Sequence, residues 1–305
     1  MKYKGLIFLV FVAVWPQWGV AHGLDQASLQ ASLTKKIPVR PIHAMTGTEF
    51  VRYVHGMDRA KREQAISEQL LKGNLPEFLR VLKPVRLNCL SGKDKLTATI
   101  FVMPDYLSIG SSRDFLRIPM NLYTATRVAR RFGFLLPTKK MVDAIYSQSD
   151  YRFKPESMLP GPRMGSTDYF FIHNLKIKKE RLALDATLGG LLSGHKKDVV
   201  VTNRLLKQRE RIAIYGWHRR NGIPIQPLST VHGARYVDYS HGIRLVSETV
   251  LINGRPRSLY EVLRDSHYST VLCNEGPILP IREIMNLKHE DRIPETLTAG
   301  FLQHG

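Results

Sequence analysis

The spacing of apolar residues changes within the first hundred positions of this chain, and this change constrains the fold more than any other feature. Apolar residues from Phe50 to Val54 recur at three- and four-residue spacing, which is typical of a helix. The later runs V-R-L-N-C-L and L-T-A-T-I-F-V-M alternate as strands do, with the turn S-G-K-D between them. Helices followed by strands, without regular βαβ alternation, predict an α+β fold. We expect an N-terminal helical segment packed on a mixed, mainly antiparallel sheet body.

Capping residues and turns give the other predicted helices. Asp58 is placed to cap a second helix that ends at the K-G-N sequence of residues 72–74, and residues 75–82 predict a short third helix. Further helices are expected at Thr124–Phe132, Lys139–Tyr146 (capped by Thr138) and Leu259–Arg264.

The second half of the chain is predicted to be mainly sheet. Residues 148–168, rich in Pro, Gly, Ser and Met, indicate a long surface loop that is either a lid, a cleft wall or an inert connection. Asn253-Gly254 is a strong hairpin signal. Strands are expected at Tyr169–His173, Val199–Asn203, Arg211–Trp217, Ala234–Tyr239 and Ile243–Ile252.

The N-terminus predicts export. A short basic region precedes an apolar run at residues 5–14 that is too short to span a membrane, and a small-residue site follows at residues 19–21. We therefore expect a signal peptide at 1–21 and a secreted or periplasmic protein without a transmembrane segment after the signal is removed. The remaining chain divides into a tether at 22–45, a helical cap at 46–83 and an α+β body at 84–305.

The charge of the chain suggests an acidic partner. The full sequence has a formal net charge of +19, and removal of Lys2 and Lys4 with the signal leaves 19 − 2 = +17. An exported protein this basic is expected to bind an anionic envelope polymer or glycan, although solubility alone also explains the charge. Nucleotide binding is not expected, because the glycine-rich run G-G-L-L-S-G-H-K-K-D has histidine where a phosphate loop needs lysine.

The chain contains two cysteines, Cys89 and Cys273. Two thiols in an oxidising compartment most often pair, so a disulfide between them is expected. The alternative is that Cys89 is a nucleophile, which pairing would prevent.

Groups able to hold protons, metals or anions concentrate between residues 212 and 246. Two imidazoles and a carboxylate can bind zinc and leave a position open for water, which makes His232, Asp238 and His241 candidate ligands. The spacing H-x5-D resembles the H-x6-D signature of zinc D-Ala-D-Ala carboxypeptidases but is one residue shorter, and the further ligand motif of that family does not follow. Zinc is the cofactor expected if these three residues bind a metal.

Acyl transfer is the second chemistry that this stretch allows. Ser240 would serve as nucleophile, with His218 or His232 as the base in hydrogen-bond reach. The five candidate catalytic residues are His241, Asp238, His232, His218 and Ser240. The candidate substrate-binding residues, chosen as cations, aromatic rings and hydrogen-bond donors, are Lys196, Lys197, Arg244, Arg235, Tyr236 and His195.

Four segments resemble a group of exported bacterial proteins without an assigned activity: G-N-L-P-E-F-L-R (73–80), G-H-K-K-D-V-V-V (194–201), I-Y-G-W-H (214–218) and V-D-Y-S-H-G-I-R-L-V (237–246). The resemblance covers most of the chain after the signal and implies no reaction. From the residues themselves we expect an exported hydrolase that acts on a cell-envelope polymer, with peptidoglycan peptide bonds as the leading substrate. The alternatives are a non-catalytic protein that binds an anionic glycan, and a structural envelope protein without a cleft.

Overall fold

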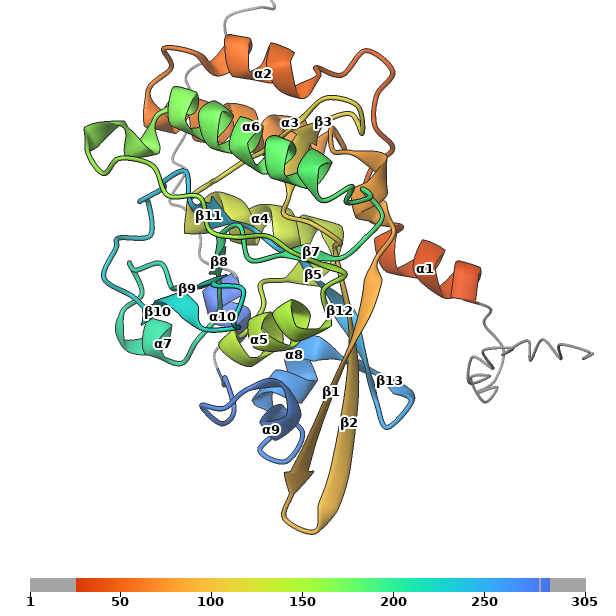
Figure 1. Cartoon of the computed structure of the whole chain (residues 1–305). Coiled ribbons are helices and arrows are strands. Elements are labelled where there is room, and N and C mark those ends of the chain that lie inside the picture. The colour runs from red at the N-terminus through yellow and green to blue at the C-terminus, as the bar shows by residue number, and fades with distance from the viewer. Residues whose placement is uncertain (1–25, 280, 286–305) are drawn as a thin grey trace, which may run out of the picture.

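A computed structural model describes residues 26–279 and 281–285. The α+β prediction is confirmed, because helices surround several mainly antiparallel sheets (Figure 1). The predicted signal peptide lies outside the described residues. Within them, no helix is long and apolar enough to cross a membrane.

The N-terminal helices begin where the capping residues predict. Thr46 forms a reciprocal capping box with Glu49, and the Asp58 side chain accepts a hydrogen bond from the backbone of Lys61. The third predicted helix is a single 3₁₀ turn, and the segment predicted to be a tether contains a helix of its own. The bounds are α1 Gln26–Thr34, α2 Gly47–Val54, α3 Arg59–Leu71 and η1 Glu77–Arg80.

The larger sheet is built on the predicted hairpin and confirms the turn at residues 91–94. Its strands run in the order β1-β2-β12-β13, β5 also pairs with β12, and all these pairs are antiparallel. Asn253 and Gly254 both have positive φ, as a two-residue hairpin turn requires. The bounds are β1 Lys83–Ser91, β2 Asp94–Val102, β5 Phe134–Leu135, β12 Val246–Ile252 and β13 Arg255–Ser258.

A smaller, four-stranded sheet contains the chemically rich segments. Its order is β10-β9-β8-β11, with β8 and β11 parallel and the other pairs antiparallel. Two further pairs are β3 with β4 and β6 with β7. The bounds are β3 Ser108–Gly110, β4 Phe115–Arg117, β6 Tyr151–Arg152, β7 Leu192–Ser193, β8 Lys197–Val199, β9 Ile214–His218, β10 Pro224–Ser229 and β11 His241–Gly242.

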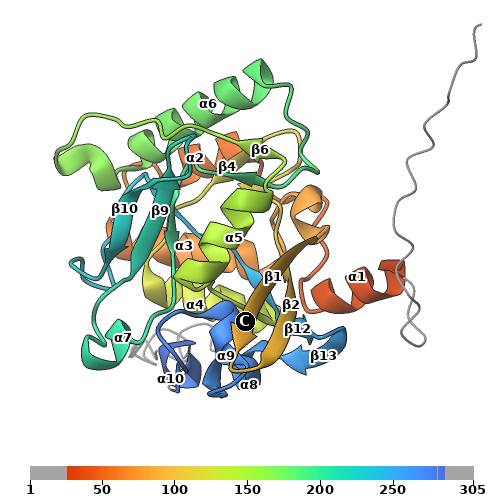
Figure 2. The same cartoon turned by 60° about the horizontal axis from the view of Figure 1, so that its bottom comes forward.

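The remaining helices connect and cover these sheets. Helix α5 lies between the two sheets and contacts both β1 and β9 (Figure 2). The predicted cap Thr138 accepts a hydrogen bond from the backbone of Met141 at its start. The bounds are α4 Leu122–Phe132, α5 Lys139–Gln148, η2 Pro162–Gly165, α6 Thr167–Ala183, α7 Arg204–Lys207, α8 Leu259–Arg264, α9 Ser269–Leu272 and α10 Ile281–Met285.

Two of the predicted strands are wrong, and a third, predicted at Val199–Asn203, overlaps a strand only at Val199. Tyr169–His173 belongs to α6, which Ser166 caps. Its buried residues Phe170, His173 and Ile177 recur at helical spacing. The apolar and aromatic residues of 169–173, taken without their neighbours, resemble a strand. Residues 234–239 are also not a strand: they form turns that lead into β11.

The predicted disulfide is wrong, because both cysteines are free. Cys89 is half-buried on β1, and its sulfur lies 3.6 Å from the hydroxyl of Thr270. Cys273 is buried after α9, and burial raises the pKa of its thiol. The two residues therefore lie in neighbouring elements, β1 and the end of α9, without being bonded.

One apolar core joins the N-terminal helices to the sheets. Phe50 of α2 and Ile66 of α3 belong to the same buried cluster as Ile100 of β2 and Val250 of β12. The helical cap therefore packs on the body through shared core residues, as the sequence predicts.

Candidate functional site

The pairing of β8 with β11 brings two distant sequence segments together. His241 is in register with Lys197, and Gly242 with Asp198. A Cβ on Gly242 would lie 2.5 Å from a ring carbon of Tyr106 and 2.7 Å from Cβ of Lys196. Only glycine allows this approach, which places the segment 194–201 directly beside the segment 237–246.

Asp238, Ser240 and His241 form a buried acid–hydroxyl–imidazole group at the start of β11. The carboxylate of Asp238 accepts hydrogen bonds from both the backbone N–H and the hydroxyl of Ser240. Nε2 of His241 lies 3.7 Å from Oδ2 of Asp238. His241 is 0% exposed, yet neither of its ring nitrogens has a hydrogen-bond partner among the described residues. Buried polar atoms usually have hydrogen-bond partners. The ring nitrogens of His241 are therefore available to bond a water molecule or a ligand.

Three half-buried side chains lie next to this group. The ring of Tyr236 is 5.7 Å from that of His241, and its hydroxyl is 3.4 Å from Asp238. His232 stacks on the outer part of this arrangement, with its ring centre 4.0 Å from that of Tyr236. Lys197 lies close enough for its charge to act on both Asp238 and His241. We call Lys197, His232 and Tyr236 the mouth of the site.

Trp217 supports the mouth from β9. The ammonium of Lys197 lies 5.0 Å from the centre of its ring, which is cation–π distance. Trp217 has a φ of +55°, and a bulky residue in this left-handed region is strained by about 1–2 kcal/mol. Strained backbone of this kind concentrates at functional sites.

Burial and charge set the protonation states of the group. Burial lowers the pKa of His241 to about 4, even though the nearby Asp238 carboxylate favours its charged form. Burial alone would raise the pKa of Asp238, but the charge of His241 and the hydrogen bonds from Ser240 outweigh it and lower the pKa. At neutral pH the group is therefore a carboxylate beside a neutral imidazole.

The predicted zinc site is not formed. Tyr236 contacts the rings of both His232 and His241. No group of three or more His, Cys, Asp or Glu side chains that could hold a metal ion comes together in the part of the chain that the structure describes. His232, Asp238 and His241 therefore do not fit a zinc ion, because the two imidazoles each pack against the Tyr236 ring and do not converge with Asp238 on a common point.

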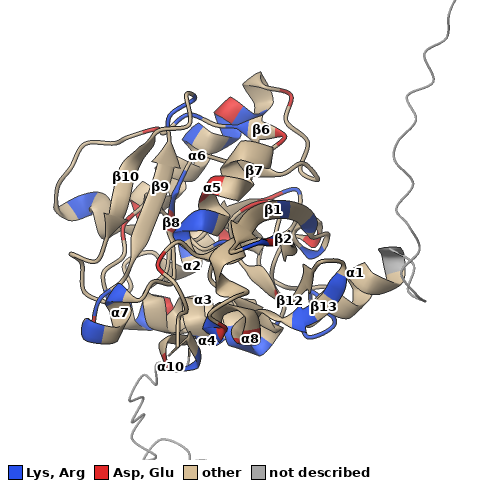
Figure 3. Cartoon of the chain, turned by 90° about the horizontal axis from the view of Figure 1, so that it is seen from below, with Lys and Arg blue, Asp and Glu red and all other residues tan. Residues whose placement is uncertain are grey.

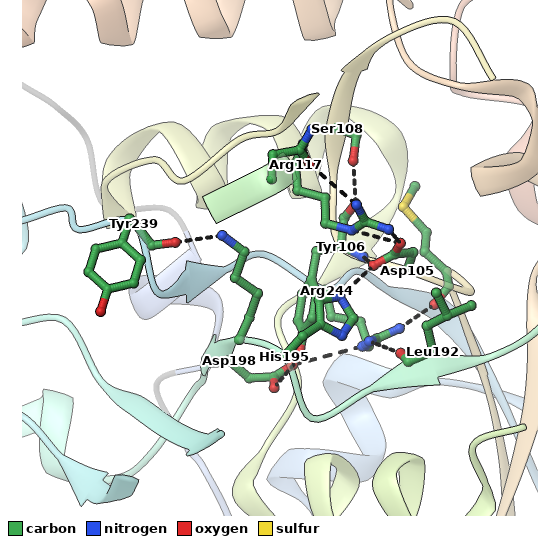
Figure 4. A network of polar contacts seen from close by, with 12 residues as sticks. Asp105, Tyr106, Ser108, Arg117, Leu192, His195, Asp198, Tyr239 and Arg244 are labelled. Atoms are coloured by element: carbon green, nitrogen blue, oxygen red, sulfur yellow. Dashed lines mark hydrogen bonds and ion pairs between the residues drawn. The ribbon is translucent and has the colours of Figure 1, made fainter. Parts of the chain in front are cut away.

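A second buried network lies behind the site and contains three of the predicted substrate-binding residues. Asp105 bonds Arg117 through two nitrogens and His195 through Nε2, at 3.1 Å (Figure 4). Asp198 accepts a hydrogen bond from the Tyr106 hydroxyl at 2.8 Å and lies 3.8 Å from Arg244.

Arg244 also donates to the backbone carbonyls of Met103 and Leu192, and Lys196 donates to the carbonyl of Tyr239 (Figure 4). Arg244, Lys196 and His195 are all about 1% exposed. Their present partners are protein atoms, so their predicted contact with substrate stays a prediction. Arg235, by contrast, is exposed beside the mouth, with its guanidinium 5.3 Å from the ring centre of Tyr123.

His218 belongs to a separate group on the other side of β9. Its Nε2 lies 3.2 Å from Asp143, its ring stacks on Tyr146, and the hydroxyl of Tyr215 also donates to Asp143. The carboxylate of Asp143 therefore holds His218 in place, and His218 does not contact Ser240. Ser240 itself donates to Asp238, so the base that a serine nucleophile needs is not in place.

Several residues near the site could not be predicted from the sequence. Asp105, Arg117, Asp143 and His173 stand alone in their segments, and only the fold brings them to their partners. His173 is buried against Tyr239, and neither of its ring nitrogens has a hydrogen-bond partner among the described residues. Helical periodicity read across residues 166–177 would have placed His173 on the buried face of α6.

The loop formed by residues 153–165 is hydrogen-bonded to Tyr239. The backbone N–H of Met158 donates to the Tyr239 hydroxyl at 2.8 Å, and the N–H of Tyr239 donates to the carbonyl of Met164 at 2.9 Å. This loop therefore contacts the residue that separates Asp238 from Ser240.

Comparisons with known protein families, with curated proteins and with solved structures return no match to this chain.

Proposed function

We propose that the protein is an exported hydrolase that acts on an anionic cell-envelope polymer, with peptidoglycan peptide bonds as the leading substrate. One observation carries the proposal: the buried imidazole of His241 lies 3.7 Å from the Asp238 carboxylate and has no hydrogen-bond partner of its own among the described residues. Structural histidines in a protein interior normally use at least one ring nitrogen in a hydrogen bond. An unused neutral imidazole beside a carboxylate is suited to general base catalysis.

In the proposed reaction His241 activates a water molecule. The imidazole takes a proton from the water while the water oxygen attacks the carbonyl carbon of the scissile amide. The C–N bond then breaks, and the imidazolium gives the same proton to the leaving nitrogen. Asp238 stabilises the imidazolium formed between these two steps, and Ser240 holds the carboxylate in place through its hydroxyl and N–H.

The mouth supplies charge and access. Lys197 is in register with His241 across the β8–β11 pair, and its ammonium would stabilise negative charge that develops on the carbonyl oxygen. Because Tyr236 covers His241, the Tyr236–His232 stack must shift before a substrate reaches the imidazole. Export and the anionic polymer rest on the N-terminal sequence and on the net charge of +19.

The test is release of soluble fragments from purified peptidoglycan sacculi by the chain without residues 1–21, analysed by mass spectrometry. His241→Ala and Asp238→Asn should abolish release, and added imidazole should restore part of the activity of His241→Ala. His43→Ala, which changes an exposed histidine, is the matched control and should release fragments as the unchanged protein does. Thermal melts of each variant would separate lost catalysis from lost folding.

A non-catalytic binding protein is the second candidate, favoured by the 0% exposure of His241. Under this function no fragments are released, and the protein sediments with the sacculi in a salt-sensitive way. That result would overturn the hydrolase. Release that survives both variants would also overturn it, because the chemistry would then lie elsewhere.

A further inference from the structure

Helix α6 carries apolar residues on two opposite sides. Its inner side packs on the protein through Phe170 and Ile177, which are both 0% exposed. Its outer side carries Ile172, Leu175 and Leu182, which are 40%, 46% and 62% exposed. These three residues fall within about 80° of the helix circumference at 100° per residue. A helix that packs on a protein core needs a single apolar stripe, so the fold does not use the outer one.

A loop borders this outer side without covering it. The hydroxyl of Tyr169 donates to the backbone carbonyl of Leu159 at 3.4 Å, and Lys176 pairs with Glu156 at 3.7 Å. Both contacts hold the loop of residues 153–165 along one edge of α6, which lies at the upper edge of the molecule in Figure 2. Leu159 is 81% exposed, so it adds to the apolar surface.

Positive charge accompanies the apolar residues. Lys178 and Lys179 are both exposed. At 100° per residue, Lys179 lies between Ile172 and Leu175 around the helix. Lys178 lies on the edge of α6 away from the loop, where it lines a cavity of about 90 Å³ with Arg113 of the β3–β4 turn. Figure 3 shows Lys and Arg segments on α6. The outer side therefore combines exposed apolar side chains with exposed ammonium groups.

We infer that the outer side of α6, together with Leu159, is a docking surface for a bilayer that contains anionic phospholipids. The apolar side chains would enter the boundary between headgroups and acyl chains, while the lysine stems lie along it and their ammonium groups reach the phosphates. Because the inner side of α6 stays packed on the protein, the helix would lie in the plane of the bilayer surface. The inference is independent of the proposed reaction, since none of these residues belongs to the mouth or to the Asp238 group.

An anionic bilayer fits this surface better than a second copy of the chain does. The formal net charge of +19 makes two copies repel each other, whereas an anionic surface attracts the same charge. Pairing two α6 helices face to face would also bring the Lys178 and Lys179 ammonium groups of both copies into one contact. The apolar strip from Ile172 to Leu182 is about 15 Å long at 1.5 Å per residue, and a fluid bilayer covers such a strip without a matching shape.

Cosedimentation with vesicles tests the inference. The vesicles consist of phosphatidylcholine, alone or with an equal amount of phosphatidylglycerol, and the protein lacks residues 1–21 so that the N-terminal apolar run cannot bind lipid itself. The variant Ile172→Ser, Leu175→Ser, Leu182→Ser should weaken binding to the anionic vesicles by about tenfold or more. The matched control Val81→Ser, Leu90→Ser, Ile223→Ser changes three comparably exposed apolar residues elsewhere and should alter binding by about twofold or less.

The contribution of charge is tested separately. Lys178→Gln, Lys179→Gln should weaken binding to the anionic vesicles by about fivefold or more at low salt, with a smaller difference at high salt. Lys93→Gln, Lys95→Gln removes two exposed charges from the β1–β2 hairpin and should change binding by about twofold or less. Thermal melts establish that the compared variants are folded.

Equal binding by the two serine variants would overturn the docking surface. Binding to neutral vesicles as strong as to anionic ones would overturn the assignment of anionic lipid. A dimer that forms without vesicles and that only the α6 serine variant dissociates, measured by light scattering, would assign the surface to a second copy instead. His241→Ala should bind vesicles as the unchanged protein does. Fragment release from sacculi without vesicle binding sinks the docking surface and spares the hydrolase, whereas vesicle binding that depends on α6 without release does the reverse.

Discussion

The ammonium of Lys196 donates a hydrogen bond to the backbone carbonyl of Tyr239, 2.5 Å away, in the interior of the protein. A carbonyl dipole compensates a buried charge far less than a carboxylate does. Burial therefore lowers the pKa of Lys196 to about 7, with the positive charge of Arg117 acting in the same direction. Since Asp105 and Arg117, and Asp198 and Arg244, form ion pairs, Lys196 is the least compensated cation of this interior group.

Lys196 should make the protein more stable as the pH rises from 7 to 9. Its pKa is about 7 in the folded state and 10.5 in the unfolded state, so the unfolded state binds more protons in this window and stability increases with pH. The gain by pH 9 is about 2 kcal/mol. Lys196→Met should remove most of it. Urea unfolding of both proteins at pH 7 and pH 9 measures the difference, and equal slopes would show that Lys196 stays charged.

The Asp105–Arg117 pair should be costly to break. Both side chains are at most 2% exposed, and Arg117 contacts Asp105 through two nitrogens. Arg117→Met leaves a buried carboxylate without its main partner, for which about 3–5 kcal/mol of unfolding free energy is expected to be lost.

The double variant Asp105→Leu, Arg117→Met is the control, because it removes both charges together. It should be more stable than Arg117→Met alone by chemical denaturation. Additive losses in the double variant would contradict this account of the pair.

The sequence predicted those parts of the fold that depend on neighbouring residues. Thr46, Asp58 and Thr138 cap helices at the expected positions, and Asn253-Gly254 forms the expected hairpin turn. Each of these caps and turns depends on residues no more than four positions apart, so the sequence alone is enough to predict it. The strand predicted at Tyr169–His173 was wrong for the opposite reason. Five residues are fewer than the two helical turns that are needed to reveal a helical period.

The candidate site was predicted in part. His232, Tyr236, Asp238, Ser240 and His241 do come together, since they lie within one short segment. The partners of His195 and His218 were not predicted, because Asp105 and Asp143 reach them only through tertiary contacts with sequence separations of 90 and 75 residues. The zinc prediction was wrong because residue spacing cannot show that the Tyr236 ring packs against the imidazoles of both His232 and His241.

Buried histidines should make the protein sensitive to acid. The pKa values of His195 and His241 are lowered to about 4, mainly by burial, and that of His173 is lowered for the same reason. Between pH 6.5 and 4 the unfolded state binds protons at these groups and the folded state does not, so stability is lost as the pH falls.

Asp198 acts in the opposite sense, because burial raises its pKa to about 6 and the folded state binds the proton first. Glu63, whose pKa burial raises to about 7, acts in the same sense as Asp198. The three histidines outweigh these two carboxyls, so the unfolding free energy should decrease by about 2 kcal/mol from pH 7 to pH 5. His241→Gln should reduce this decrease. A flat profile between these two pH values, measured by urea unfolding, would mean that the histidines are hydrated in solution.

Gly242→Ala should destabilise the protein by at least about 2 kcal/mol, because the new methyl group would lie 2.5 Å from the Tyr106 ring and 2.7 Å from Cβ of Lys196. Either contact forces β8 and β11 apart, and with them Lys197 and His241. Gly189→Ala is the matched control, since a Cβ there meets no atom within 4 Å. Thermal melts should show a lower midpoint for Gly242→Ala alone. A normal midpoint would mean that the two strands separate without loss, and the juxtaposition of Lys197 and His241 would then not depend on this glycine.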